Sequence, residues 1–169
     1  MTAKLLRGLV VVVVLATTGI VWLAGPAAAK GPANTQISGV GTFVADTEEE
    51  CTEIDDLYTL RMTGSLEGCW YTTVLNVVQE TPSGIYQERG VETFKGCLVE
   101  DGVDVACGEF TTTYHFTAKY APDGSEIHGR CHHPIVSGAG DFDGATGRVD
   151  FKDDVVTGDF DYRGHIKLA

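Results

Sequence analysis

The chain has 169 residues, of which 12 are Lys or Arg and 24 are Asp or Glu, giving a formal net charge of −12 at neutral pH. Such an acidic balance argues against binding to nucleic acid or to an anionic membrane, because an acidic surface cannot replace the counterions of either polyanion. The length is that of one domain with a modest hydrophobic core.

Residues 1–29 have the features of a signal peptide. Lys4 and Arg7 form a positive n-region, residues 9–24 form an apolar run, and Ala27 to Ala29 provide an A-x-A cleavage site. The apolar run has 16 residues, fewer than the ~20 that a membrane-spanning helix needs. We therefore predict a secreted protein with no membrane attachment after cleavage, whose single domain spans residues 30–169 and carries a formal charge of 10 − 24 = −14.

The secreted part is predicted to consist of β-strands joined by short turns. Apolar and polar residues alternate with period two between Gly, Asp and Pro punctuation, which is typical of strands. The expected strands are residues 37–44, 57–66, 69–78, 85–94, 110–120, 127–135, 148–151 and 157–168. About eight short strands indicate an all-β fold, either a single antiparallel β-barrel or a sandwich.

The patterns of residues 157–168 and 69–78 predict which faces of these two strands are buried. Residues 157–168 alternate strictly, so that Phe160, Tyr162 and Ile166 share a face directed at a core. Residues 69–78 are apolar on both faces, which predicts a strand between two layers. The acidic run 46–56 is expected to be a solvated loop.

All five cysteines lie in the secreted part, where disulfides are the default. Cys97 and Cys107 flank the Asp101-Gly102 turn signal, so a hairpin would bring them together as a disulfide. Cys69 with Cys131 is the second expected pair, and Cys51 is then free or pairs between chains. Zinc ligation is the alternative, but the sequence has no C-x-x-C pair.

The glycine-rich segment 138–151 could be a phosphate-binding loop or a turn. A dinucleotide fingerprint needs a third glycine where Asp143 stands, and the residues after it alternate instead of showing helical spacing. A calcium loop is disfavoured because D-x-D-G here lacks the remaining ligands of an EF-hand. The segment is therefore predicted to be a turn followed by a strand.

The sequence VSGAGDFDGATGRVDF resembles the glycine-rich signature G-x-G-x-F-x-G-x-x-G of the allene oxide cyclase and dirigent superfamily, in particular of its small bacterial members. The stretches GTF, GSLEG, YQERGVETFKG, GEF and GDFDY agree in order, so the resemblance spans most of residues 37–168. It implies an eight-stranded antiparallel barrel that holds a hydrophobic small molecule, and a homo-oligomer, commonly a trimer. It also implies a role for Glu92, which stands where the bacterial relatives place a glutamate before the glycine matching Gly96.

The expected strand 85–94 carries the candidate site. Alternation places Tyr86, Glu88, Glu92 and Phe94 on one face. If this face looks into a barrel, desolvation would suit Glu92 as a catalytic general acid or base; if it looks outward, both glutamates are simply solvated. The candidate ligand pocket consists of Trp70, Tyr86, Glu88, Tyr114 and Phe116.

The sequence disfavours both a metal site and a serine hydrolase site. The cluster HGRCHHP offers His128, Cys131, His132 and His133 as metal ligands, but consecutive residues of a strand point to opposite faces, so we expect no metal and no other cofactor. The sequence has no G-x-S-x-G nucleophile elbow, so a serine hydrolase is not expected.

The sequence therefore favours a secreted β-barrel that binds a small apolar molecule, with a dirigent-like or isomerase-like steering role as a further step. It leaves open whether there is any catalysis. The alternative is a secreted structural or interaction protein whose barrel is filled with side chains, as in many small barrels.

Overall fold

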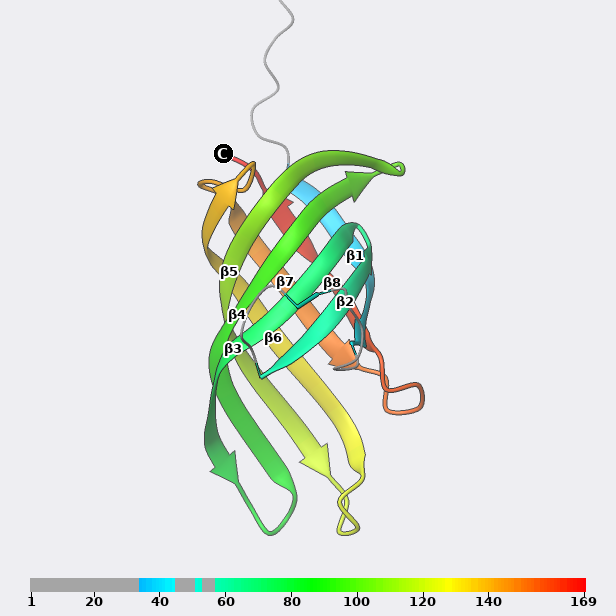
Figure 1. Ribbon diagram of the computed structural model, residues 1–169. Helices are drawn as coiled ribbons and strands as arrows, with labels where there is room; N and C mark the ends of the chain where they lie inside the picture. Colours follow the sequence, from blue (N-terminus) through cyan, green and yellow to red (C-terminus); the bar gives the residue numbers. More distant parts are fainter. Residues whose placement is uncertain (1–33, 45–50, 53–56) are drawn as a thin grey trace, which may run out of the picture. The chain divides into compact units, whose positions relative to one another are not determined.

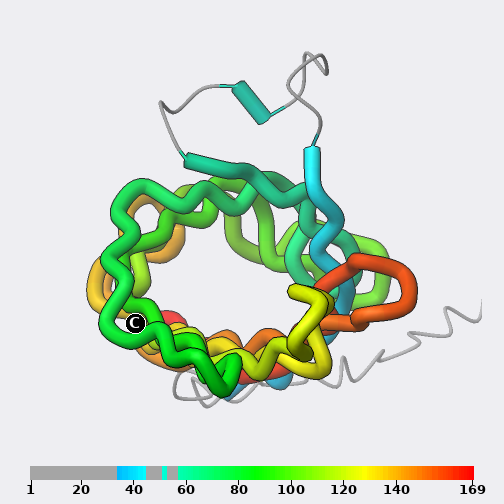
Figure 2. The backbone as a smooth tube through the Cα atoms, turned by 90° about the horizontal axis from the view of Figure 1, so that it is seen from below, coloured from blue at the N-terminus to red at the C-terminus, as the bar shows by residue number. Residues whose placement is uncertain are grey.

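Eight antiparallel strands form one closed sheet, in which each strand pairs with its neighbours in the sequence and β1 also pairs with β8 (Figures 1 and 2). The computed structural model describes residues 34–44, 51–52 and 57–169. The strands are β1 (Asn34–Phe43), β2 (Tyr58–Gly64), β3 (Leu66–Glu80), β4 (Ile85–Glu100), β5 (Val103–Tyr120), β6 (Glu126–Gly140), β7 (Thr146–Asp153) and β8 (Phe160–Lys167). The all-β prediction is confirmed, whereas the predicted signal peptide and most of the predicted acidic loop lie outside the described residues.

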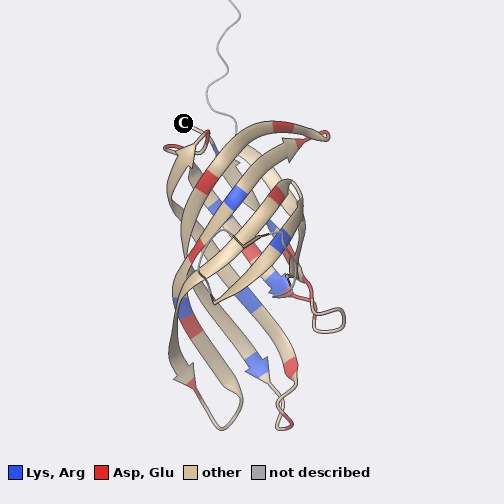
Figure 3. Cartoon of the chain, viewed as in Figure 1, with Lys and Arg blue, Asp and Glu red and all other residues tan. Residues whose placement is uncertain are grey.

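The described ranges contain no helix that is long and apolar enough to cross a membrane. Acidic and basic residues are interspersed along the strands in the view of Figure 3. Strands β3 to β6 are the long ones, with 15 to 18 residues, and their hairpins extend beyond the other strands at the two ends of the sheet (Figure 1).

The boundary between β2 and β3 differs from the expected strand 57–66. The chain turns at Gly64 and Ser65, so Leu66 begins β3. Gly64 has a φ of 103°, a backbone conformation that glycine adopts without steric cost. The turn between β4 and β5 does follow its signal, since Asp101 and Gly102 both have positive φ values, of 53° and 76°, as a type I′ hairpin turn requires.

The expectation that residues 69–78 lie between two layers is wrong for the second half of the segment. Val74, Val77 and Val78 are 43%, 54% and 52% exposed. A single closed sheet has no second layer to cover them. Only near the start of the segment are both faces buried, with Trp70 on the interior face and its neighbour Tyr71 on the outer face.

One end of the interior is filled by side chains. We call it the packed end; it carries the β2–β3, β4–β5 and β6–β7 turns. Its fully buried residues are Leu66, Phe94, Leu98, Phe110, Phe142, Val149 and Ile166. The ring of Phe110 lies 4.9 Å from that of Phe94 and 5.2 Å from that of Phe142, centroid to centroid. These contacts close this end with a continuous apolar core.

The glycine-rich segment is the turn between β6 and β7, as predicted. It places Phe142 in the packed end with no exposed surface. Gly140 and Gly144 on either side of Phe142 have φ values of 68° and 69°. At Gly138, a Cβ atom would lie 2.0 Å from the carbonyl oxygen of Phe142. The glycines therefore let the chain fold back closely enough to bury this ring.

Replacing Gly138 with alanine is expected to lower the free energy of unfolding by roughly 1 to 3 kcal/mol, the usual range for overpacking. The clash is with a backbone oxygen, which cannot rotate away as a side chain can. Urea unfolding followed by circular dichroism measures the change. Ser137→Ala is the control, because Ser137 is exposed on the same strand. Equal stability of both variants would show that the turn tolerates a Cβ atom at residue 138.

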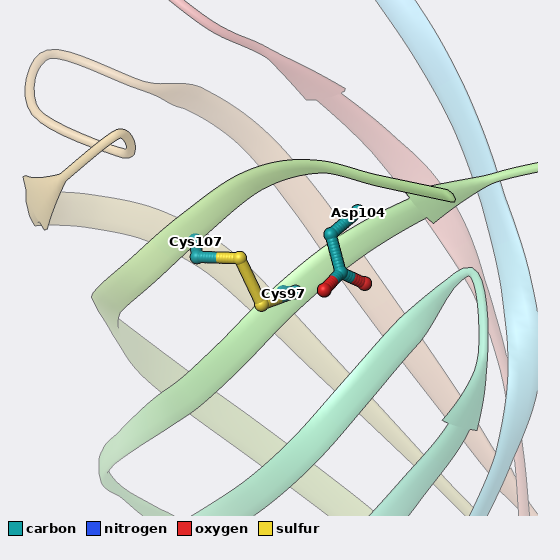
Figure 4. A group of neighbouring side chains, drawn as sticks. All are labelled: Cys97, Asp104 and Cys107. Atoms are coloured by element: carbon teal, nitrogen blue, oxygen red, sulfur yellow. A yellow bond between two sulfur atoms is a disulfide. The ribbon is translucent and has the colours of Figure 1, made fainter. Parts of the chain in front are cut away.

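The predicted disulfide Cys97–Cys107 is present and joins residues that pair directly across β4 and β5 (Figure 4). The carboxylate of Asp104 lies beside it, but both sulfurs are engaged in the bond and therefore supply no thiolate for a metal.

The expected pair Cys69–Cys131 is wrong. Cys69 is bonded to Cys51, and Cys131 is a buried free thiol. The physical reason is the alternation along the strands. Cys69 is adjacent to Trp70, whose side chain points inward, so Cys69 lies on the outer face, while Cys131 lines the interior. The expectation that Cys51 is free or pairs between chains is wrong for the same bond.

Candidate functional site in the interior of the closed sheet

The other end of the interior is hollow. A cavity of about 260 Å³ opens toward the β3–β4, β5–β6 and β7–β8 turns, and we call this the cavity end. Figure 2 views the closed sheet from this side. The cavity is lined by Phe43, Tyr58, Leu60, Trp70, Glu88, Glu92, Phe116, Tyr120, Glu126, Cys131, His133, Phe151, Asp153 and Phe160. The wall thus combines aromatic rings with four carboxyl groups.

Trp70 separates the packed end from the cavity. Its ring contacts Phe94 and Phe110 of the packed end, with centroids 6.2 and 5.8 Å away. It also contacts Phe151 and His133 of the cavity wall, at 5.1 and 5.3 Å. The indole Nε1 donates a hydrogen bond of 2.6 Å to Oε2 of Glu92, so the buried polar atom of this side chain is satisfied.

Glu92 is a buried carboxyl group of the cavity wall and is 3% exposed. Its Oε1 accepts a hydrogen bond of 2.8 Å from the hydroxyl of Thr72, the residue opposite it on β3. Its Oε2 lies 2.6 Å from Nε2 of His133 on β6, which is the strand beyond β5 in the sheet. Three strands therefore converge on one carboxyl group, a degree of fixation that a functional group requires.

The protonation of His133 follows in part from its other contact. Nδ1 lies 3.1 Å from the carbonyl oxygen of Val149, which can only accept, so Nδ1 carries a proton. Nε2 lies 2.6 Å from Oε2 of Glu92, so the imidazole bridges a backbone carbonyl and a carboxyl group. The imidazole is fixed by stacking on Tyr114, whose ring centroid is 5.7 Å away. Such a fixed pair can accept a proton from a bound molecule and return it.

Glu88 is the second buried carboxyl group, 6% exposed. It accepts hydrogen bonds from the hydroxyls of Tyr86, at 2.5 Å, and Tyr114, at 3.0 Å. Burial and these contacts raise the pKa of both tyrosines above the usual value of 10, so both remain donors at neutral pH. Gly90 makes the arrangement possible, because a Cβ atom there would lie 2.4 Å from the ring of Tyr114.

Glu126 and Asp153 form a pair of carboxyl groups nearer the opening. Burial, a hydrogen bond that the protonated Asp153 donates to Glu126 and the repulsion of the Glu126 charge raise the pKa of Asp153 to about 7. Gly129 packs directly against both carboxyl groups. A Cβ atom there would be 2.6 Å from Oε1 of Glu126 and would clash with Oδ2 of Asp153. Apart from the proton of Asp153, the buried Oε1 of Glu126 has no hydrogen-bond partner.

The remaining titratable groups of the wall are held in their neutral forms. Burial, followed by the negative charges of Glu92 and Glu88, raises the pKa of the Cys131 thiol well above 9. Burial and the charge of Glu92 likewise raise the pKa of Tyr58. A thiolate nucleophile is therefore disfavoured, and the chemistry that these side chains support is hydrogen bonding and proton transfer.

The structure brings most of the residues predicted from the sequence into one place. Glu92, Trp70, Glu88 and Phe116 line the cavity. Tyr86 and Tyr114, predicted to line it as well, are not part of its wall and instead donate hydrogen bonds to Glu88.

Sequence reasoning missed His133 as the partner of Glu92 and missed Tyr58, Glu126 and Asp153 altogether. His132 and His133 do point to opposite faces, as expected: His132 is exposed and contacts Asp150 at 2.9 Å, while His133 is buried. That alternation was the available signal for His133, because an inward-facing histidine in a closed sheet needs a polar partner.

Comparisons of the chain with protein-family models, with curated proteins and with solved structures find no match.

Proposed function

We propose that this protein is a secreted β-barrel that binds a small molecule in its interior. The observation that carries the proposal is the division of the interior into a packed end and a cavity. An interior filled throughout with side chains would have suited the alternative, a purely structural or interaction protein. A concave, largely aromatic wall with a few fixed polar groups is typical of ligand sites. The two disulfides are compatible with an oxidising extracellular environment.

The dimensions of the cavity limit the ligand. Its volume of about 260 Å³ lies just below the range of ~300 to 1,000 Å³ common for small-molecule sites. The ligand is therefore small, with an apolar body that packs between Trp70, Phe116 and Phe151. Burial of that body supplies affinity at about 25 cal/mol per Å² of apolar surface.

Glu92 and His133 extend the proposal from binding to a steering or isomerase-like role. A proton removed from one atom of the ligand would pass to this pair and return to another atom of the same molecule. The reaction balances without a redox partner or a cofactor. It would also agree with the resemblance to allene oxide cyclases and dirigent proteins, which we propose as distant relatives.

Filling the cavity should weaken binding of an apolar molecule. We expect the neutral apolar dye N-phenyl-1-naphthylamine to bind the wild-type protein with a stoichiometry of one and a rise in fluorescence. Cys131→Phe places a ring in the cavity and is expected to weaken dye binding by about tenfold or more, a loss of about 1.4 kcal/mol.

The matched control is Val136→Phe, which adds the same ring at an exposed position of the same strand. It should bind the dye like the wild type, and near-ultraviolet circular dichroism should show that both variants are folded. Failure of the wild-type protein to bind the dye, or equal binding by both folded variants, would contradict a ligand site in the interior.

A further inference from the structure

The wall of the cavity has a strong imbalance of charge. It contains four carboxyl groups, and among the described residues that line it there is no lysine or arginine. His133 is the one basic side chain of the lining and is already engaged by Glu92. A cavity of this composition repels anionic ligands and favours cations.

Glu88 shows the imbalance most clearly. It is nine-tenths buried, and both of its hydrogen bonds come from neutral tyrosine hydroxyls. No ion pair of Glu88 is found within the described part of the chain. A buried carboxylate without a cation is costly, and each of its oxygens retains one lone pair for a further donor.

The pair Glu126 and Asp153 offers a second set of acceptors. With a pKa of about 7, the carboxyl group of Asp153 keeps its proton below neutral pH. Apart from the proton of Asp153, the buried Oε1 of Glu126 has no hydrogen-bond donor. Nearby, the ring of Tyr86 contacts Phe116 and Tyr120, each with a centroid distance of 6.1 Å, and the latter two rings also line the cavity. Carboxylates beside aromatic faces are the features that recognise ammonium groups.

We propose that the ligand of the cavity is a small protonated amine with an apolar body. The ammonium group donates its protons to Glu126, Asp153 and Glu88, and the body lies against Trp70 and Phe151. This inference rests on the proposed function, because it assigns the chemical class of the molecule that the cavity binds. An organic cation fits better than a metal ion, since the one three-ligand cluster in the described part of the chain is at Cys97, Asp104 and Cys107, outside the cavity.

The test compares three probes of similar shape and different charge on the full chain by isothermal titration calorimetry at pH 7.5. The probes are phenethylamine, 2-phenylethanol and phenylacetate. We expect phenethylamine to bind about tenfold or more tightly than 2-phenylethanol, and phenylacetate to show no binding. Phenethylamine should also displace N-phenyl-1-naphthylamine, which places it in the cavity.

Matched variants separate a specific site from the general attraction of an acidic protein. Glu126→Gln is expected to weaken phenethylamine binding by about fivefold or more and to leave the binding of 2-phenylethanol unchanged. Asp104→Asn removes the same charge from an exposed position on the β4–β5 hairpin, at the packed end, and should change neither.

The outcomes distinguish this inference from the proposed function. Equal or tighter binding of the alcohol or the acid, or an equal loss of amine affinity in Asp104→Asn, would overturn the amine assignment while dye binding in the cavity stands. Failure of the three probes and the dye to bind would overturn the cavity site itself and the amine assignment with it. Because the wild-type series alone decides the order of affinities, misfolding of Glu126→Gln would not prevent a decision.

Discussion

Replacing Glu92 with alanine is expected to lower the free energy of unfolding by about 3 to 5 kcal/mol, the usual cost of breaking a buried ion pair by removing one partner. The substitution removes the acceptor of two hydrogen bonds, from Trp70 and Thr72, and leaves Nε2 of His133 without its partner. All three groups are buried, so water cannot fully replace the carboxylate. Chemical denaturation at pH 7 measures the loss.

The control for this variant is Glu67→Ala. Glu67 is exposed on β3, the strand that pairs with β4, so we expect the free energy of unfolding to change by no more than about 0.5 kcal/mol. Glu92→Gln should fall between the two, because its amide oxygen can still accept from Trp70 while one acceptor is lost. A loss in Glu92→Ala no larger than in Glu67→Ala would show that the convergence on Glu92 contributes nothing to stability.

A double-mutant cycle would isolate the contact between Glu92 and His133. The variants are Glu92→Gln, His133→Gln and the combination of both. Because the two side chains are 2.6 Å apart, the double variant should cost less than the sum of the single variants, by about 0.5 to 3 kcal/mol. Additive costs would instead assign the stability effect to Trp70 and Thr72.

Alternation and turn chemistry were sufficient to predict the all-β class and several contacts. The face that carries Phe160, Tyr162 and Ile166 does point into the interior, because strict period-two patterns leave a strand one way to bury its apolar side. The Asp101-Gly102 turn correctly predicted that Cys97 and Cys107 come close enough for a disulfide. The turn alone would set Cys97 opposite Ala106, and the register shift between Leu98 and Val99 places it opposite Cys107.

The partners within the site depend on register and closure, which no single strand encodes. The contact of Glu92 with His133 requires β4 and β6, the two neighbours of β5, to turn these side chains into one closed interior. Glu126 faces inward because a register shift between Lys119 and Tyr120 alters the alternation near the start of β6. The expected pair Cys69–Cys131 conflicts with the alternation itself, because a strand that turns Trp70 inward must turn Cys69 outward.

The carboxyl group of Asp153 is expected to make the protein less stable as pH rises from about 4 to about 7. Its pKa is raised from 3.8 to about 7 in the folded protein by burial and by Glu126. Within this window the folded state retains a proton that the unfolded state has lost, so raising the pH favours unfolding, and the loss is complete above the folded pKa. Asp153 is half-buried, so solvent screening limits the effect to roughly 1 to 2 kcal/mol.

The comparison of wild type with Asp153→Asn removes the contribution of other titrating groups. The variant cannot ionise at this position, so its stability relative to the wild type should increase between pH 4 and pH 7 and then remain constant. At pH 8 we expect it to be more stable by roughly 1 to 2 kcal/mol. Near pH 4 the two proteins should be equally stable, because the carboxyl group of Asp153 is then protonated in the folded wild type and is as uncharged as the amide of the variant. Urea unfolding at pH 4, 6 and 8 measures the difference, and a difference that does not change with pH would mean that Asp153 ionises normally at the opening of the cavity.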